Sequence, residues 1–126
     1  MTEHLAVISL GSNIDPEKNV AKAVERLASI GRIKKKSTFI YTEPLLYEDQ
    51  PKFLNGTVLL ETGSSQDKLR RQLKTLEVKL GRIRTANKNG PRTIDLDIIV
   101  FDGKIVDDDY YKRDFLQKMV AEVLEF

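Results

Sequence analysis

Hydrophobic residues recur along the chain with two spacings, which predict where strands and helices lie. The apolar run at residues 5–10, closed by Gly11-Ser12-Asn13, is typical of a buried strand. A helix is expected to begin at Asp15-Pro16, because aspartate caps helices and proline suits the first helical position. We expect Gly31 to end it. Its apolar residues follow helical spacing: Val20, Val24, Leu27 and Ala28.

The middle of the chain contains segments that alternate with a period of two. Strands are predicted at residues 33–41, up to the break at Glu43-Pro44, and at residues 53–61. In the second strand one face carries Phe53, Asn55, Thr57 and Leu59, and the other carries Leu54, Val58 and Leu60. A helix that begins at Ser64 or Ser65 and ends at Gly81 follows. Its core stripe is Leu69, Leu73, Leu76 and Leu80.

In the last third of the chain the hydrophobic pattern predicts a strand at residues 94–101, a short strand at 104–106 and an amphipathic helix at 114–124. The resulting order, β-α-β-β-α-β, is that of the split βαβ unit. We therefore expect an α+β fold, a ferredoxin-like βαββαβ sandwich with the helices packed on one face of an antiparallel sheet. We find no linker, repeat or low-complexity segment, so a single domain over residues 1–126 is expected.

Composition narrows the class of protein. Hydrophobic residues make up 40% and charged residues 32% of the 126, which is typical of a globular protein. The absence of cysteine excludes disulfides and thiolate metal sites. A net charge of +2 argues against general nucleic-acid binding, and no apolar run approaches a membrane span or a signal peptide. We expect a cytoplasmic monomer whose partners are small molecules.

Two aspartates interrupt the last long strand. Alternation places Asp95 and Asp97 on one face, roughly 6–7 Å apart. At an effective dielectric constant near 20 their charges repel by roughly 2–3 kcal/mol. Carboxylates on a rigid strand suit magnesium, although Arg92 could instead pair with one while the other faces solvent. The opposite face is apolar throughout: Ile94, Leu96, Ile98 and Val100.

A basic segment precedes this strand. Residues 81–93 hold four cations and no acid, and they show no apolar period. Taken alone the segment could be a solvated loop, but beside two metal-binding carboxylates it indicates phosphoryl transfer from ATP. The glycine-rich motifs of P-loop and dinucleotide-binding proteins are absent, and no Ser-His-Asp set is plausible.

Two further positions leave alternatives open. Asn55 and Phe53 could read the edge and the face of a flat heterocycle, or could be an edge residue and a core residue. Glu77, beside the leucine stripe, could be a boundary charge or a ligand contact.

Five segments together resemble the 6-hydroxymethyl-7,8-dihydropterin pyrophosphokinases of folate biosynthesis. They are Leu10-Gly11-Ser12-Asn13, Thr42-Glu43-Pro44, the run from Asp49 to Asn55, the run from Leu80 to Arg84, and Gly90-Pro91-Arg92-Thr93-Ile94-Asp95-Leu96-Asp97-Ile98-Ile99. The resemblance covers about residues 4–106. It implies a ferredoxin-like fold and a magnesium-dependent enzyme that transfers the β,γ-pyrophosphoryl group of ATP to the pterin hydroxymethyl group, releasing AMP.

The resemblance also implies roles for single residues. Asp95 and Asp97 would bind two magnesium ions, while Arg82 and Arg92 would neutralise the transferred group. Contacts with ATP would come from these arginines and from Arg84, Glu77, Ile98 and Arg113. The pterin would lie between Phe53 and Phe115, with Asn55, Thr42 and Leu45 reading its edge.

Several departures from the family keep other functions open. Asn89 stands where the family usually has tryptophan, the usual Pro-His loop is missing, and the chain ends at Phe126, which is short for the family. These departures motivate the alternative of a divergent member that binds pterin or nucleotide with weak or no transfer. A third alternative, a ferredoxin-like module that binds RNA through its sheet, is disfavoured because Asp95 and Asp97 would face the phosphates.

Overall fold

An antiparallel sheet organises the molecule, a computed structural model that describes residues 3–43, 50–81 and 93–124. The strands follow the order β2-β4-β1-β5-β6, with β3 also paired to β4. Every pairing between them is antiparallel. The α+β class expected from the sequence is therefore confirmed. The elements are β1 (His4–Ser12), α1 (Pro16–Leu27), β2 (Arg32–Lys36), β3 (Ile40–Thr42), β4 (Phe53–Thr62), α2 (Gln66–Lys79), β5 (Asp95–Phe101), β6 (Lys104–Ile105), α3 (Asp109–Lys112) and α4 (Asp114–Val123).

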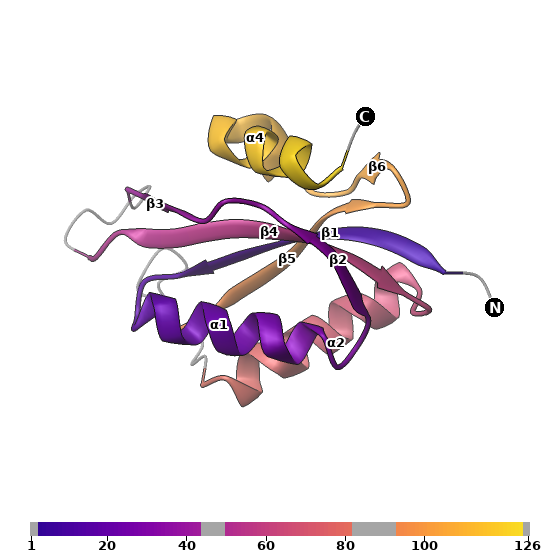
Figure 1. Cartoon of the computed structure of the whole chain (residues 1–126), viewed down its shortest axis with the longest axis horizontal. Helices are drawn as coiled ribbons and strands as arrows, with labels where there is room; N and C mark the ends of the chain where they lie inside the picture. The colour runs from indigo at the N-terminus through magenta and orange to yellow at the C-terminus, as the bar shows by residue number, and fades with distance from the viewer. Residues whose placement is uncertain (1–2, 44–49, 82–92, 125–126) are drawn as a thin grey trace.

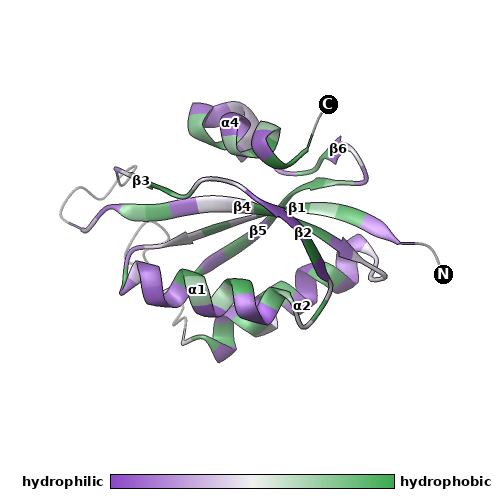
Figure 2. Cartoon of the chain, viewed as in Figure 1, coloured by the Kyte–Doolittle hydropathy of each residue, from purple (hydrophilic) through white to green (hydrophobic). Residues whose placement is uncertain are grey.

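Helices cover both faces of the sheet, so the expectation of helices on one face is wrong. Helices α1 and α2 lie on one side and α4 on the other (Figure 1). The α4 side has its own apolar cluster, in which Leu116, Val120 and Val123 pack against Val7, Leu59, Ile99 and Val100. The alternating hydropathy along α1 and α4 reflects one apolar face on each helix (Figure 2). A sheet that is apolar on both faces requires a helix on each.

A bulge in β5 corrects one prediction about its faces. Val7 pairs with Val100 and Ile8 pairs with Ile98, which leaves Ile99 as an extra residue. Ile99 and Val100 consequently both belong to the cluster beneath α4. Ile94, Leu96 and Ile98 do face α1 and α2, as predicted, but Val100 does not. The bulge follows the two aspartates, so their shared face is preserved.

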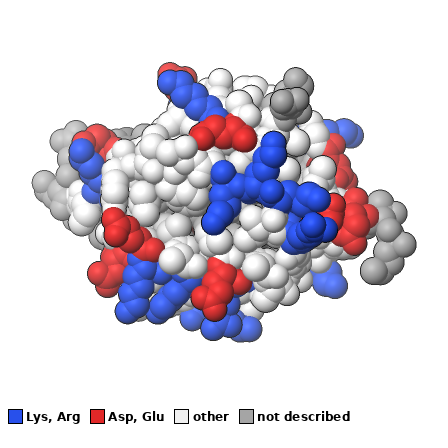
Figure 3. Space-filling model, viewed as in Figure 1, with Lys and Arg blue, Asp and Glu red and all other residues white. Residues whose placement is uncertain are grey.

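The strand predicted at residues 33–41 is in fact two strands, β2 and β3, that both pair with β4. Between them the Ser37 hydroxyl accepts a hydrogen bond from the Thr57 amide at 2.8 Å. A side chain therefore replaces a backbone acceptor, and the regular ladder is interrupted. Strand β2 is exposed along most of its length, and basic side chains gather over its region of the surface in Figure 3. Lysines on an edge strand discourage pairing with another chain.

Helix ends are partly as predicted. Ser65 caps α2 by accepting a hydrogen bond from the Lys68 amide at 3.2 Å, which decides between Ser64 and Ser65. Helix α1 ends at Leu27, before Gly31. A Cβ at Gly31 would lie 2.6 Å from the Glu61 carbonyl oxygen, so this glycine permits close approach to β4. No helix in residues 3–43, 50–81 and 93–124 is long and apolar enough to cross a membrane.

Candidate active site

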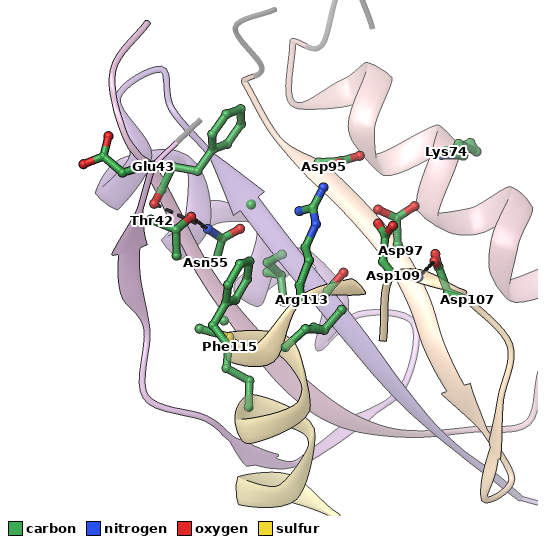
Figure 4. Close-up of a pocket in the computed structure, with 17 residues that line it drawn as sticks. Thr42, Glu43, Asn55, Lys74, Asp95, Asp97, Asp107, Asp109, Arg113 and Phe115 are labelled. Carbon is green, nitrogen blue, oxygen red and sulfur yellow. Dashed lines mark hydrogen bonds between the residues drawn. The ribbon is translucent and has the colours of Figure 1, made fainter. Parts of the chain in front are cut away.

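A cleft of about 330 Å³ lies between the α4 face of the sheet and the beginning of α4. Figure 4 shows Thr42, Asn55 and Phe115 at one end and Asp97, Asp107 and Asp109 at the other. Seven of the residues singled out from the sequence line this one cleft, namely Thr42, Phe53, Asn55, Asp95, Asp97, Arg113 and Phe115. Four elements that are far apart in sequence, β3, β4, β5 and α4, therefore contribute side chains to one site.

Strand register explains how the two ends come together. Gly11 of β1 pairs with Asn55 of β4 on one side and with Asp95 of β5 on the other. Directly paired residues project to the same face, so Asn55 and Asp95 are about 10 Å apart across the central strand. A Cβ at Gly11 would lie 2.9 Å from Asn55 Oδ1. The glycine thus leaves an open floor between the amide and the carboxylate.

The amide end of the cleft combines aromatic and polar groups. Asn55 donates a hydrogen bond from Nδ2 to Thr42 Oγ1, while its Oδ1 faces the floor at Gly11. Phe53 and Phe115 line the same end and are half-buried. Helix α4 is held to the sheet here, because Thr57 Oγ1 donates to the Met119 carbonyl at 2.8 Å. An amide beside two aromatic rings can bind a flat heterocycle.

The acidic end concentrates negative charge. Burial, and next the carboxylate of Asp95, raise the pKa of Asp97 to about 7, while Lys74 acts in the opposite direction. Asp107 and Asp109 also line the cleft. Asp107 accepts a hydrogen bond from the Asp109 amide at 2.9 Å, which starts the short helix α3. A bound cation would stabilise the charged form of a carboxylate whose pKa is raised in this way.

The oxygen donors of Asp95 and Asp97 fit magnesium. The ion is typically held by one or two carboxylates, with water and substrate phosphates completing its coordination. The described residues that line the cleft include no cysteine and no histidine, the ligands that would favour zinc. Among the described residues no group of three or more histidine, cysteine or acidic side chains is placed to hold a metal alone. The pair therefore suits an ion that arrives with a phosphorylated substrate.

Glu77 lies behind β5 and does not line the cleft. Its carboxylate is buried and accepts a hydrogen bond from the Leu96 amide at 2.8 Å. Lys74 Nζ, which belongs to a residue that lines the cleft, lies 3.4 Å from Glu77 Oε1. Glu77 thus anchors β5 between its two aspartates. The contact of Glu77 with ATP stays a prediction.

The structure does not place the other predicted site residues in the cleft. Ile98 is in the core on the α1 and α2 side of the sheet, and its contact with ATP also stays a prediction. Leu45, Arg82, Arg84 and Arg92 fall outside the described residues.

Sequence reasoning missed three features of the cleft. Lys74 carried a signal, because it is three residues before Glu77 on one helix. The sequence predicts that Gly11 closes the first strand, whereas it lies inside β1. Glycine inside a strand often marks a close approach of backbone or ligand. The sequence contains the acidic run Asp107-Asp108-Asp109, but only the tertiary fold brings Asp107 and Asp109 to Asp97.

Comparison with known proteins finds one family model and several similar relatives. The model of the family 7,8-dihydro-6-hydroxymethylpterin-pyrophosphokinase (HPPK) matches residues 7–125. The chain is 42% identical over 101 residues to the folic acid synthesis protein fol1 of Schizosaccharomyces pombe, which is 78% of this chain and 14% of that protein. It is 37% identical over 109 residues to the 2-amino-4-hydroxy-6-hydroxymethyldihydropteridine pyrophosphokinase of Campylobacter jejuni, with 82% of this chain and 67% of the relative covered.

The protein of the same name from Bacillus subtilis is 34% identical over 133 residues, covering 97% of this chain and 79% of the relative. The chain therefore spans most of this bacterial relative but only 14% of the fungal one. The family model covers nearly the whole chain, including both ends of the cleft. The chain belongs to the 7,8-dihydro-6-hydroxymethylpterin-pyrophosphokinase family.

Proposed function

We propose that this protein transfers the diphosphate group of ATP to the hydroxymethyl group of 6-hydroxymethyl-7,8-dihydropterin, in folate biosynthesis, and releases AMP. The observation that carries the proposal is the row formed by Asn55, Gly11 and Asp95 across three adjacent strands. A recognition site for a flat ring and a carboxylate site for a metal share one cleft, with no side chain between them on the central strand. The names of the bacterial relatives agree with this activity.

The pterin is assigned to the amide end of the cleft. Phe53 and Phe115 would stack on its two faces, and Asn55 and Thr42 would form hydrogen bonds with its edge, together with Leu45. Since Thr42 already accepts a hydrogen bond from Asn55, the amide is held in a fixed orientation before the ligand arrives. Fixing the amide in advance lowers the entropy cost of binding.

ATP is assigned to the acidic end. Asp95 and Asp97 would hold magnesium, with two ions expected, and magnesium when bound neutralises phosphate oxygens and orients them. Arg82, Arg84, Arg92 and Arg113 would contact the phosphates and the nucleotide, with further contacts from Glu77 and Ile98. In the reaction the pterin hydroxyl group releases its proton to solvent and its oxygen bonds to the β-phosphorus of ATP. The bond between that phosphorus and the α,β-bridging oxygen breaks, so that this oxygen leaves on AMP. The residues contribute mainly by positioning and charge neutralisation.

One observation favours a second function, that of a relative which binds but transfers poorly. Asp107 and Asp109 add negative charge to the end of the cleft that would receive ATP. Lys74 and Arg113 are the cations that line it within the described part of the chain. The arginines at positions 82, 84 and 92 would have to offset this excess.

Release of AMP tests the proposal. Wild-type protein is incubated with ATP, magnesium and 6-hydroxymethyl-7,8-dihydropterin beside an Asp95→Ala/Asp97→Ala variant, with Asp108→Ala as a matched control for loss of an exposed carboxylate. We expect AMP from wild type and control and none from the double variant. Binding of both ligands without AMP would favour the binding-only function.

We also infer a ferredoxin-like arrangement, a single domain over residues 1–126 and a cytoplasmic monomer. The order β2-β4-β1-β5 within the sheet supports the first inference. Light scattering during gel filtration tests the oligomeric state, and limited proteolysis tests the single domain.

A further inference from the structure

A second cavity lies on the other side of the sheet, between α1 and α2. This α1–α2 groove has a volume of about 440 Å³ and shares no lining residue with the cleft. Such a volume is within the range of small-molecule sites. It is lined by Arg26, Ser29, Ile30, Lys68, Arg71, Gln72, Thr75, Leu76 and Lys79.

The charge of the groove is of one sign. Four of its nine lining residues are basic and none is acidic. None of the four forms an ion pair within the described part of the chain. Asp67, the nearby acid in the first turn of α2, lies 3.9 Å from Arg70 on another side of the helix. The groove therefore carries uncompensated positive charge.

Three features along one stripe of α2 are unfavourable for the stability of the protein. Lys68 places a cation in the first turn, at the positive end of the helix dipole. Lys68 and Arg71 are like charges three residues apart, an arrangement that is mildly destabilising. Gln72 Oε1 is buried and has no hydrogen-bond partner among the described residues. Unfavourable interactions that cluster at one place, without a visible gain in stability, are typical of binding sites.

The chemistry of the groove selects its ligand. Phosphate oxygens would satisfy the basic side chains. Rotation of the Gln72 side chain, whose oxygen is buried without a partner, would present that oxygen to a hydrogen-bond donor in the groove. Lys68 and Lys79 are three turns apart, about 16 Å along the helix axis, so a ligand longer than a single phosphate can be held. We propose that the α1–α2 groove binds a small molecule with two or more phosphates, which contact Arg26, Lys68 and Arg71, and with an organic group that donates a hydrogen bond to Gln72 Oε1.

The experiment uses NMR titration of backbone amides in the Asp95→Ala/Asp97→Ala background without magnesium, so that binding in the cleft is suppressed. Inorganic triphosphate and GTP serve as separate probes. We expect saturable shifts in α2 and around Arg26, with a Kd that Arg71→Glu weakens about tenfold. The control Lys118→Glu makes the same charge change on α4, across the sheet, and should leave the Kd nearly unchanged.

The glutamine is tested separately. Gln72→Leu should raise thermal stability, because it removes an unsatisfied buried oxygen. It should also reduce the affinity for GTP to that for triphosphate. Equal affinity for both probes in the unchanged groove would overturn the role of Gln72. Absence of saturable shifts up to about 10 mM, or equal weakening by Arg71→Glu and Lys118→Glu, would overturn the site itself.

Discussion

Gly11 of β1 lies between the two ends of the cleft, and because glycine has no side chain the floor there is open. Gly11 does not have a positive φ, so alanine there would not strain the backbone. Its Cβ, however, would lie 2.9 Å from Asn55 Oδ1 and would displace the amide. We predict that Gly11→Ala weakens pterin binding about tenfold or more, while thermal stability stays equal or rises because the unfolded chain loses entropy. Titration with a pterin analogue and a thermal melt measure the two effects.

Gly63→Ala is the matched control for this substitution. The nearest atom to a Cβ at Gly63 is Glu3 Oε1 at 3.9 Å, an ordinary contact far from the cleft. It should gain similar stability without any loss of binding. Equal loss of pterin affinity in both variants would show that the open floor at Gly11 is not the cause.

The pKa of Asp97 predicts how stability depends on pH in the metal-free protein. It is raised from its ordinary value of 3.8 to about 7, first by burial and then by Asp95. Between these values the folded state keeps a proton that the unfolded state has released, so stability falls as pH rises towards 7. Asp97→Asn should remove this decline, by up to about 1.4 kcal/mol for each pH unit in that window.

Urea denaturation at pH 5 and pH 8 without divalent ions tests this effect. Asp108→Asn, at an exposed acid beside the cleft, should retain the wild-type dependence on pH. Magnesium affinity in the presence of an ATP analogue should rise with pH up to about 7, because the metal requires the carboxylate. Identical pH slopes in wild type and Asp97→Asn would contradict the assignment.

At the scale of elements, Glu77 links α2 to the edge of β5. Its Oε2 accepts from the Leu96 amide, which lies between the two aspartates in the chain. Glu77→Leu leaves that buried donor without an acceptor, and we predict a loss of about 1–3 kcal/mol in the free energy of unfolding together with a large loss of AMP formation. Glu77→Gln keeps an acceptor and should retain most of the stability. If Glu77 also contacts ATP, Glu77→Gln will weaken nucleotide binding while stability is retained, which separates the two roles.

Elements also show what the sequence could and could not predict. The faces of β4 were predicted correctly, and the start of α2 was predicted to within one residue, at Ser64 or Ser65, because each depends on residues within one element. The bulge at Ile99 depends on how β5 pairs with β1, which no local pattern contains. The position of α4 on the opposite face follows from the second apolar surface of the sheet. An isolated pattern of helical apolar positions does not specify which surface it covers.

The same distinction applies to the site. Asp95 with Asp97, and Phe53 with Asn55, were predictable as neighbours because residues two apart on a strand share a face. Lys74 and Asp107 join the cleft only through tertiary packing. The open floor at Gly11 needs three strands in register, so no single segment could reveal it.

At the scale of the whole molecule, the cleft lies between two parts with different attachments. Strands β1, β4 and β5 form the centre of the sheet, while, in the part of the chain that the structure describes, α4 is joined to it by one apolar cluster and a few hydrogen bonds. Two of these are Thr57 Oγ1 to the Met119 carbonyl and the Thr38 amide to Glu122 Oε1. We expect α4 to open more readily than the sheet, since few interactions need to be broken.

A ligand at the amide end would contact Phe53 of the sheet and Phe115 of α4 at once, and so would join the two parts. We predict that a pterin analogue at 100 times its Kd slows hydrogen exchange in α4 by up to about a hundredfold, because the opened state cannot bind it. An ATP analogue with magnesium should protect β5 and the end of α2 more than α4. Thr57→Val should speed exchange in free α4 by removing one tie, and the pterin analogue should restore much of the protection. If hydrogen exchange in α4 of the free protein is instead as slow as in β1, then α4 opens only with global unfolding. The pterin would then stabilise the fold as one unit.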